Sequence, residues 1–130
     1  MSALSNYAEK LLLDWLMTAG SATRPTAWYV GLFTAAPSDS GGGTEVSGSG
    51  YARQSATFAA ATSGAGTTDN SAAVTFTAAG GSWGTITHIG IFDALTTGNL
   101  LWHGAMTASK TIADGDTLEF AIGNIDLTLA

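Results

Sequence analysis

The sequence has no cysteine, only two prolines and only four basic residues among 130. Without cysteine the chain forms no disulfides, has no thiolate zinc ligands and has no cysteine nucleophile, while its cellular compartment stays undecided. Charged residues make up 11% of the chain, which is low for a globular protein. Ten acids give a net charge of −6, so we expect neither nucleic acid nor an anionic membrane as a partner.

Long hydrophobic runs are also missing. No apolar stretch approaches the roughly 20 residues of a spanning helix, and the opening MSALSNYAEK lacks the basic and apolar regions of a signal peptide. Yet 45% of the residues are apolar, which is too many for a disordered chain. We therefore expect one folded domain over residues 1–130, with part of its uncharged surface covered by another chain.

A helix is predicted at residues 3–18, within an N-terminal segment of residues 1–20. Asn6 and Glu9 fit a capping box, Ser2 and Ser5 are alternative caps, and Gly20 suits the left-handed turn that ends a helix. A helix of this length is marginal alone in water, so we predict that its apolar face is buried against its own domain or a neighbour. The residues of that face recur three and four apart: Leu4, Ala8, Leu11, Leu12, Trp15 and Leu16.

The rest of the chain has a β pattern. Runs of aromatic and β-branched residues, separated by Gly, Asn, Asp and Ser, predict strands at residues 27–34, 52–58, 73–77, 85–93, 100–107, 110–112, 117–122 and 125–129. Residues 94–99 are expected to join two strands as a hairpin. The fold class is therefore mainly β: an antiparallel, jelly-roll-like sandwich of about eight strands over residues 26–130, with one N-terminal helix. The last strand carries a single charged residue, Asp126, that would hinder pairing of its edge with other chains. We therefore expect this strand to be paired, internally or with a neighbour.

The two histidines give only a weak case for a metal. A hairpin turn near Thr96 makes His88 and His103 possible cross-strand neighbours, but a zinc site needs a third ligand. Asp93 lies five positions after His88, so its side chain points to the opposite face of the strand. Histidines that hydrogen-bond locally are the commoner case, and we expect no metal site.

No other arrangement of residues favours catalysis. The segment GSGYA resembles a nucleophile elbow but lacks the strand–turn–helix context, and the acids are scattered along the chain. Trp15, Trp28 and Trp102 lie in apolar segments and are expected in the core. Trp83, in GGSWGT, is the candidate for an exposed contact. We expect no enzymatic activity, no catalytic residue and no cofactor.

A long polar segment, AAPSDSGGGTEVSGSGYARQ, occupies residues 35–54. It cannot be a P-loop, because no lysine and no helix follow its glycines and because Asp39 and Glu45 would repel phosphate. We predict a surface loop on the β scaffold, where binding residues often lie. The candidate partner contacts are Asp39, Ser40, Gly41, Gly42, Gly43 and Glu45, together with Trp83.

The order of these segments resembles a family of small virion proteins of tailed bacteriophages, whose members are labelled head decoration or tail fibre proteins. The resemblance covers LSNYAEKLLLDWL, the segment from WYVGLFT to GYARQ, the segment from VTFT to LLWHGAM, and KTIADGDTLEFAIGNIDLTL. Its most specific parts are EVSGSGYARQ and WGTITHIGIFDA. It brings no catalytic residue and implies a structural role on the virion.

The resemblance also gives the loop a structural reason. Gly48 and Gly50 permit backbone angles closed to other residues. Tyr51 can then turn into the core, while Arg53 points outward or pairs with Glu45. Residues 41–43 would form the mobile tip.

The first function we expect is a capsid decoration or cement protein, a homo-oligomer that binds other phage structural proteins, chiefly the major capsid protein. The alternative is a tail fibre or tail-tip component that contacts the host receptor. A third hypothesis, a small lectin or hydrolase accessory, would bind sugar at an exposed Trp83.

Overall fold

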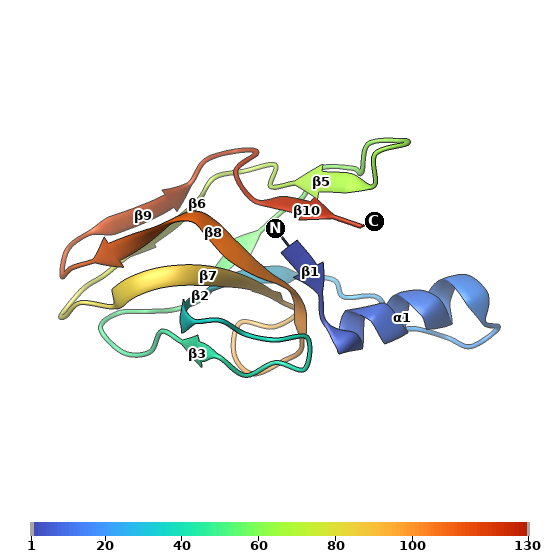
Figure 1. Ribbon diagram of the computed structural model, residues 1–130, viewed down its shortest axis with the longest axis horizontal. Helices are drawn as coiled ribbons and strands as arrows, with labels where there is room; N and C mark the ends of the chain where they lie inside the picture. Colours follow the sequence, from blue (N-terminus) through green and yellow to red (C-terminus); the bar gives the residue numbers. More distant parts are fainter. Residues whose placement is uncertain (1, 130) are drawn as a thin grey trace.

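The computed structural model describes residues 2–129, which form ten strands and one helix (Figure 1). The helix is α1 (Asn6–Met17), and no helix within these residues is long and apolar enough to cross a membrane. The longer strands are β2 (Trp28–Ala35), β7 (Gly84–Phe92) and β8 (Leu100–Ile112). The shorter ones are β1 (Ser2–Leu4), β3 (Thr44–Glu45), β4 (Gln54–Ala56), β5 (Thr67–Asp69), β6 (Val74–Thr77), β9 (Thr117–Phe120) and β10 (Asp126–Thr128).

The strands form two antiparallel layers, as predicted. One layer is a six-stranded sheet in the order β1-β8-β7-β2-β3, with β4 also pairing with β2. The other layer consists of two separate pairs, β6-β9 and β5-β10 (Figure 1). The last strand, β10, is paired internally with β5, so the expectation that the chain's final strand has a partner is confirmed.

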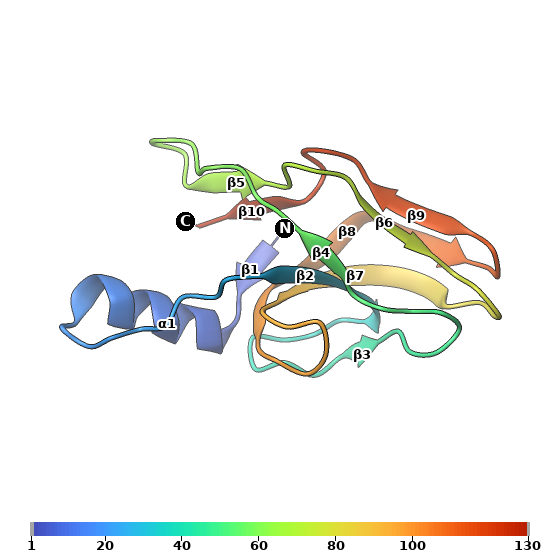
Figure 2. The same ribbon diagram turned by 180° about the vertical axis from the view of Figure 1, so that it is seen from behind.

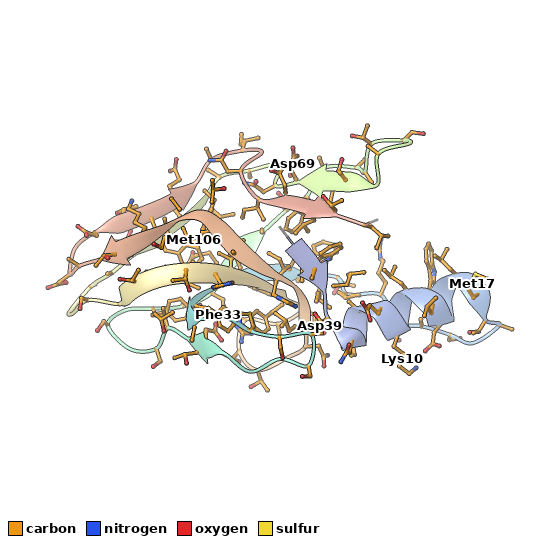
Figure 3. The ribbon with its side chains drawn as sticks, in the orientation of Figure 1. Lys10, Met17, Phe33, Asp39, Asp69 and Met106 are labelled. Carbon is orange, nitrogen blue, oxygen red and sulfur yellow. The ribbon has the colours of Figure 1, made fainter. Side chains whose placement is uncertain are left out.

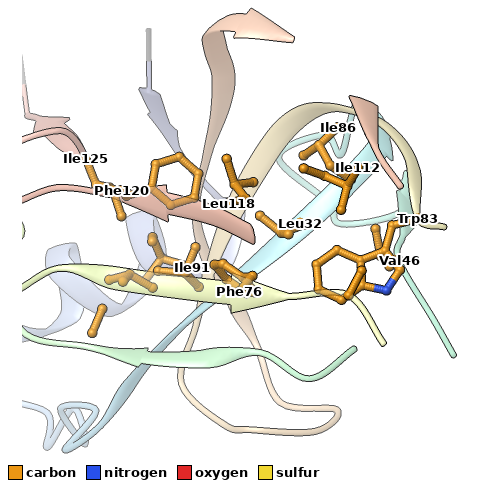
Figure 4. Packing of buried hydrophobic residues seen from close by; sticks show 14 of the residues in the cluster. Leu32, Val46, Phe76, Trp83, Ile86, Ile91, Ile112, Leu118, Phe120 and Ile125 are labelled. Atoms are coloured by element: carbon orange, nitrogen blue, oxygen red, sulfur yellow. The ribbon is translucent and has the colours of Figure 1, made fainter. Parts of the chain in front are cut away.

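The core lies between the two layers. The large sheet contributes inward-facing aliphatic residues such as Leu32, Ile86 and Ile91, and the second layer contributes Phe76 and Leu118, all of them buried (Figure 4). Strands β6 and β9 alternate buried and exposed residues, because only one face of that pair meets the core. Trp28 and Trp102 were predicted in the core; they are partly buried and pack against this cluster, at its edge rather than within it.

Strand β2 is buried on both faces. Four successive residues, from Val30 to Phe33, are buried, so the sheet must also be covered on its outer side. A second, smaller cluster lies there and consists of Phe33, Phe92 and Leu100, with the two phenylalanine rings stacked 6.1 Å apart. Gly31 and Gly90 face each other in the strand register on this side, and the missing side chains leave room for the cluster.

The predicted set of strands needs two corrections. The runs 100–107 and 110–112 belong to the single strand β8, which is continuous through a bulge: His88 pairs with Ala105 but Ile86 pairs with Lys110. Strands β1, β3 and β5 were not predicted, because two or three residues carry no alternation that a pattern can detect.

The helix begins at Asn6 rather than at residue 3. Ser5 is its N-cap: the Ser5 hydroxyl accepts a hydrogen bond from the Ala8 amide at 3.2 Å and donates one to the Leu100 carbonyl. The capping box expected at Asn6 is therefore wrong, and Ser5, one of the two alternative caps, is confirmed. Gly20 does not adopt a positive φ. The helix ends at Met17, and Thr18 is its C-cap, whose hydroxyl donates to the Asp14 carbonyl at 2.7 Å.

Candidate functional site

The helix projects away from the sandwich and is attached chiefly at its first turn (Figure 1, Figure 2). Ser5 donates its amide hydrogen to the Leu101 carbonyl at 2.9 Å, and the Asn6 amide donates to the Asp39 carbonyl at 2.8 Å. Met17, at the far end of the helix, is 77% exposed (Figure 3). The body therefore anchors the start of α1 and leaves its second half without a packing surface of its own.

The predicted apolar face exists, but the chain buries only part of it. Ala8 is buried, and Leu11 and Leu12 are half-buried against the body. Trp15 and Leu16 continue the same face one turn further and are 64% and 63% exposed. The prediction that Trp15 and Leu16 are buried, with Trp15 in the core, is therefore wrong for the chain alone. We call Leu11, Leu12, Trp15 and Leu16 the helix patch.

An apolar groove of about 330 Å³ adjoins the helix patch. Ala8, Leu11 and Leu12 line it from the helix. The body contributes residues from five separated segments: Leu4, Arg24, Pro25, Trp28, Ala61, Gly66, Thr67, Thr68, Leu101, Trp102, Leu127 and Leu129. The side chain of Leu129 is about half exposed. The helix patch and this groove form one continuous apolar surface, which sequence reasoning missed because the groove joins residues from both ends of the chain.

A second hollow, of about 470 Å³, lies between β8 and β9. These consecutive strands diverge into different layers. Within the described part of the chain, residues 105–110 of β8 pair with no strand on the side away from β7. The bulge at residues 106–109 interrupts that edge, and a bulge of this kind protects an exposed edge from pairing with other chains. Met106 lies at this bend (Figure 3).

The two most specific sequence segments meet on the outer face of the sheet. The Arg53 guanidinium binds both carboxylate oxygens of Glu45, from Nε to Oε1 and from Nη2 to Oε2, each at 2.8 Å. Its Nη1 donates to the carbonyls of Ala94 and Thr97, at 2.9 and 2.7 Å. The expected Arg53–Glu45 pair is thus present, and it also holds the hairpin loop at residues 93–99.

Tyr51 turns into the core, as expected. Its ring stacks on Phe76 and meets Trp83 edge-on at 5.5 Å. Its hydroxyl accepts a hydrogen bond from the Leu32 amide at 2.9 Å and donates one to Glu45 Oε1 at 2.8 Å. The Leu32 amide lies on the edge of β2, between the parts of β2 that pair with β3 and with β4. Burial is the main cause that raises the pKa of the Tyr51 hydroxyl well above its ordinary value.

Trp83 is 7% exposed and belongs to the main core, so its predicted role as an exposed contact is wrong. Its indole Nε1 donates to the Ser49 carbonyl at 3.0 Å, which ties the end of the polar loop to the start of β7. Nothing at this position offers a ring face to a sugar. The lectin hypothesis loses the residue on which it depended.

The loop residues proposed as contacts divide into two groups. The Glu45 carboxylate is occupied by Arg53 and Tyr51. Ser40, Gly42 and Gly43 are exposed and Gly41 is half exposed, and an isolated β-bridge joins Ser38 to Gly41. This tip remains available to a partner.

The histidines do not form a pair. His88 lies opposite Ala105 and His103 lies opposite Gly90, so the two are offset by two positions in the register. His103 Nε2 hydrogen-bonds Asp39 Oδ1 at 2.8 Å, and His88 Nδ1 hydrogen-bonds the Thr87 hydroxyl at 2.8 Å. Residues 2–129 contain no group of three or more His, Cys, Asp or Glu placed to hold a metal.

The described residues thus form a small β-sandwich with the Arg53–Glu45 contact on the outer face of its large sheet and the helix patch on the projecting helix. A family model described as "Podophage GP4 fiber I protein gp80" matches residues 3–128, and the chain belongs to this family of phage proteins. It is therefore a structural protein of a phage and a component of the virion, as the sequence resemblance implied. None of the curated proteins compared with the chain matched it.

Proposed function

We propose that this chain is a subunit of a phage fibre, with a structural and non-catalytic role, and that it joins other virion proteins through the helix patch. The description of its family as a fiber protein supports the fibre assignment. The exposed part of the helix patch supports the attachment. The exposed tip of the loop at residues 40–43 is a second surface for contact with a partner or receptor.

The observation that carries this proposal is the exposure of Trp15 and Leu16 on an anchored helix. Burial of apolar surface contributes about 25 cal/mol per Å², so a tryptophan and a leucine left in water forgo a large stabilisation. Contiguous exposed apolar patches usually mark interaction sites. A partner that covers the helix patch would also stabilise a helix of 12 residues, which is marginal alone.

Capsid decoration is the second candidate. It is favoured by the shape of the chain, because residues 2–129 contain one short helix and no element long enough to form a fibre shaft. As a decoration protein, the sandwich would bind the major capsid protein in many copies, and weak individual contacts would add through avidity.

The experiment that separates the two candidates combines location with function. Cryo-electron microscopy of particles gives the position and copy number of the sandwich. Few copies at the tail, together with loss of adsorption when the protein is removed, would support the fibre. Copies spread over the head lattice, with removal lowering the heat stability of the head while adsorption stays normal, would overturn the fibre proposal in favour of decoration.

A further inference from the structure

The helix patch and the adjoining groove are complementary features of the same molecule. The patch ends in two projecting side chains, Trp15 and Leu16, while the groove beside it is an apolar hollow of about 330 Å³. The anchoring of Ser5 to Leu100 and Leu101 fixes the direction of the helix. The projecting side chains therefore cannot fold back to fill the groove of their own chain.

Charge also favours a second copy of the chain as the occupant. The charged residues of the helix and of the segment after it are Glu9, Lys10, Asp14 and Arg24, two acids and two bases, so this segment of the chain carries no net charge. The whole net charge of −6 lies in the remainder of the chain. Contact between the helices of two copies therefore brings together segments without net charge, whereas contact through the rest of the sandwiches would bring together the segments that carry the net negative charge.

One charged residue at the groove lacks an ion-pair partner in its own chain. Lys10 pairs with Asp14, and Arg53 with Glu45, but within residues 2–129 neither Arg24 nor Glu9 takes part in a salt bridge. Arg24 lines the groove. Glu9 lies beside the helix patch, one position after Ala8, so an incoming helix would bring its carboxylate toward Arg24 of the copy that it enters.

The area of contact favours mutual insertion. A stable protein–protein contact buries about 800 Å² on each partner, while one tryptophan supplies about 150–250 Å². The tip of a single helix is therefore too small. A two-fold arrangement uses the same patch and the same groove on both copies, so each copy buries a helix and a groove at once.

We infer that the chain forms a two-fold dimer in which the helix of each copy places Trp15 and Leu16 in the groove of the other. Glu9 of each copy pairs with Arg24 of its counterpart. This inference concerns the purified chain and does not depend on whether the dimer belongs to a fibre or to a head lattice. Its failure would leave the fibre proposal standing, and failure of the fibre proposal would leave the dimer standing.

Analytical ultracentrifugation of the purified full chain tests the dimer. We expect the unmodified chain to sediment as a dimer, and Trp15→Glu to raise the dissociation constant by at least about a hundredfold, because it places a charge in an apolar contact. The matched control is Met17→Glu, which adds the same charge to an exposed residue about two and a half turns after Ala8, on the opposite side of the helix. That variant should remain dimeric.

A charge exchange tests the geometry. Arg24→Glu and Glu9→Arg should each raise the dissociation constant of the dimer about tenfold. The two substitutions combined in one chain should restore the original dissociation constant. Circular dichroism melts in dilute solution confirm that every variant folds. A monomeric unmodified chain would overturn the inference. So would a dimer that survives Trp15→Glu, equal loss with Met17→Glu, or a double charge variant that is no tighter than either single one.

Discussion

The guanidinium carbon of Arg53 lies 3.5 Å from the centre of the Phe92 ring. The same guanidinium is paired with Glu45 and bound to two carbonyls of the hairpin loop, and its side chain is 9% exposed. One side chain thus joins the polar loop, the second apolar cluster and the hairpin. Arg53 and Glu45 lie in EVSGSGYARQ and Phe92 lies in WGTITHIGIFDA, so this contact joins the two segments that most specifically resemble the phage family.

We predict that Arg53→Ala lowers the free energy of unfolding by about 3 kcal/mol, because it leaves the Glu45 carboxylate partly buried without its cation. Arg53→Lys should recover only part of the loss, since lysine lacks the forked geometry that binds both oxygens. Lys10→Ala is the control, because it breaks an exposed helix pair worth about 0.5 kcal/mol or less. Urea melts measure all three variants. Equal losses in free energy of unfolding for Arg53→Ala and Lys10→Ala would contradict a stabilising role of the Arg53–Glu45 pair.

Two tryptophans should respond in opposite ways to truncation. Trp83→Ala should cost about 3–5 kcal/mol, because it empties a core position. Trp15→Ala should cost less than about 1 kcal/mol, because a substitution at an exposed position removes few contacts. The measurement is a urea melt at a concentration low enough to keep the chain monomeric. A large loss for Trp15→Ala under those conditions would mean that the helix packs on its own body.

Gly90 should not tolerate a side chain. A β-carbon there would lie 2.8 Å from Leu100 Cδ1 and 2.9 Å from Phe33 Cε2. We predict that Gly90→Ala destabilises the chain by about 1–3 kcal/mol through overpacking of the second cluster. Gly20→Ala is the matched control, because its β-carbon would approach only the exposed Thr18 hydroxyl, at 3.3 Å. Thermal melts compare the two, and a neutral Gly90→Ala would show that the cluster can rearrange.

The Tyr51 hydroxyl should make stability fall at alkaline pH. Because burial raises the folded-state pKa above that of the unfolded chain, the unfolded chain loses this proton first as the pH rises. The contribution of the Tyr51 hydroxyl to the free energy of unfolding is therefore complete below about pH 10 and declines above it. Tyr51→Phe should cost about 1–3 kcal/mol near neutral pH, since it leaves the Leu32 amide unpaired. Urea melts should show that the difference in free energy of unfolding between the unmodified chain and Tyr51→Phe shrinks above about pH 10. A difference that stays constant with pH would contradict the raised pKa of Tyr51.

Much of the fold followed from the sequence pattern. Strands β2, β6, β7 and β9 were predicted to within two residues at each end, because aromatic and β-branched runs of four or more residues carry a clear signal. The turn of Tyr51 into the core and the possible Arg53–Glu45 pair followed from two glycines beside them. Strands β1, β3 and β5 escaped prediction because their pairing partners, such as β8 for β1, create them, whereas the short strands β4 and β10 were predicted within longer runs.

The candidate site could be predicted only in part. The periodicity of the helix correctly identified an apolar face, but it could not tell how much of that face the body would cover. Trp83 appeared to be a loop residue, and its burial depends on Tyr51 and Ser49, which lie more than thirty positions earlier. The groove joins Leu4 and Leu12 to Leu127 and Leu129, residues from the two ends of the chain.

The sequence by itself determined that the chain is mainly β, that it carries one amphipathic helix, and that it belongs with phage virion proteins. The first two properties depend on local spacing and on residue types, which a linear pattern records, and the third depends on the resemblance of several segments to a known family. The tertiary structure decided where the helix points. Ser5 caps the helix and binds the carbonyls of β8, so the sandwich covers Ala8, half-covers Leu11 and Leu12, and leaves Trp15 and Leu16 in water. The contact that fixes this direction spans 95 positions in sequence, and no local pattern records it.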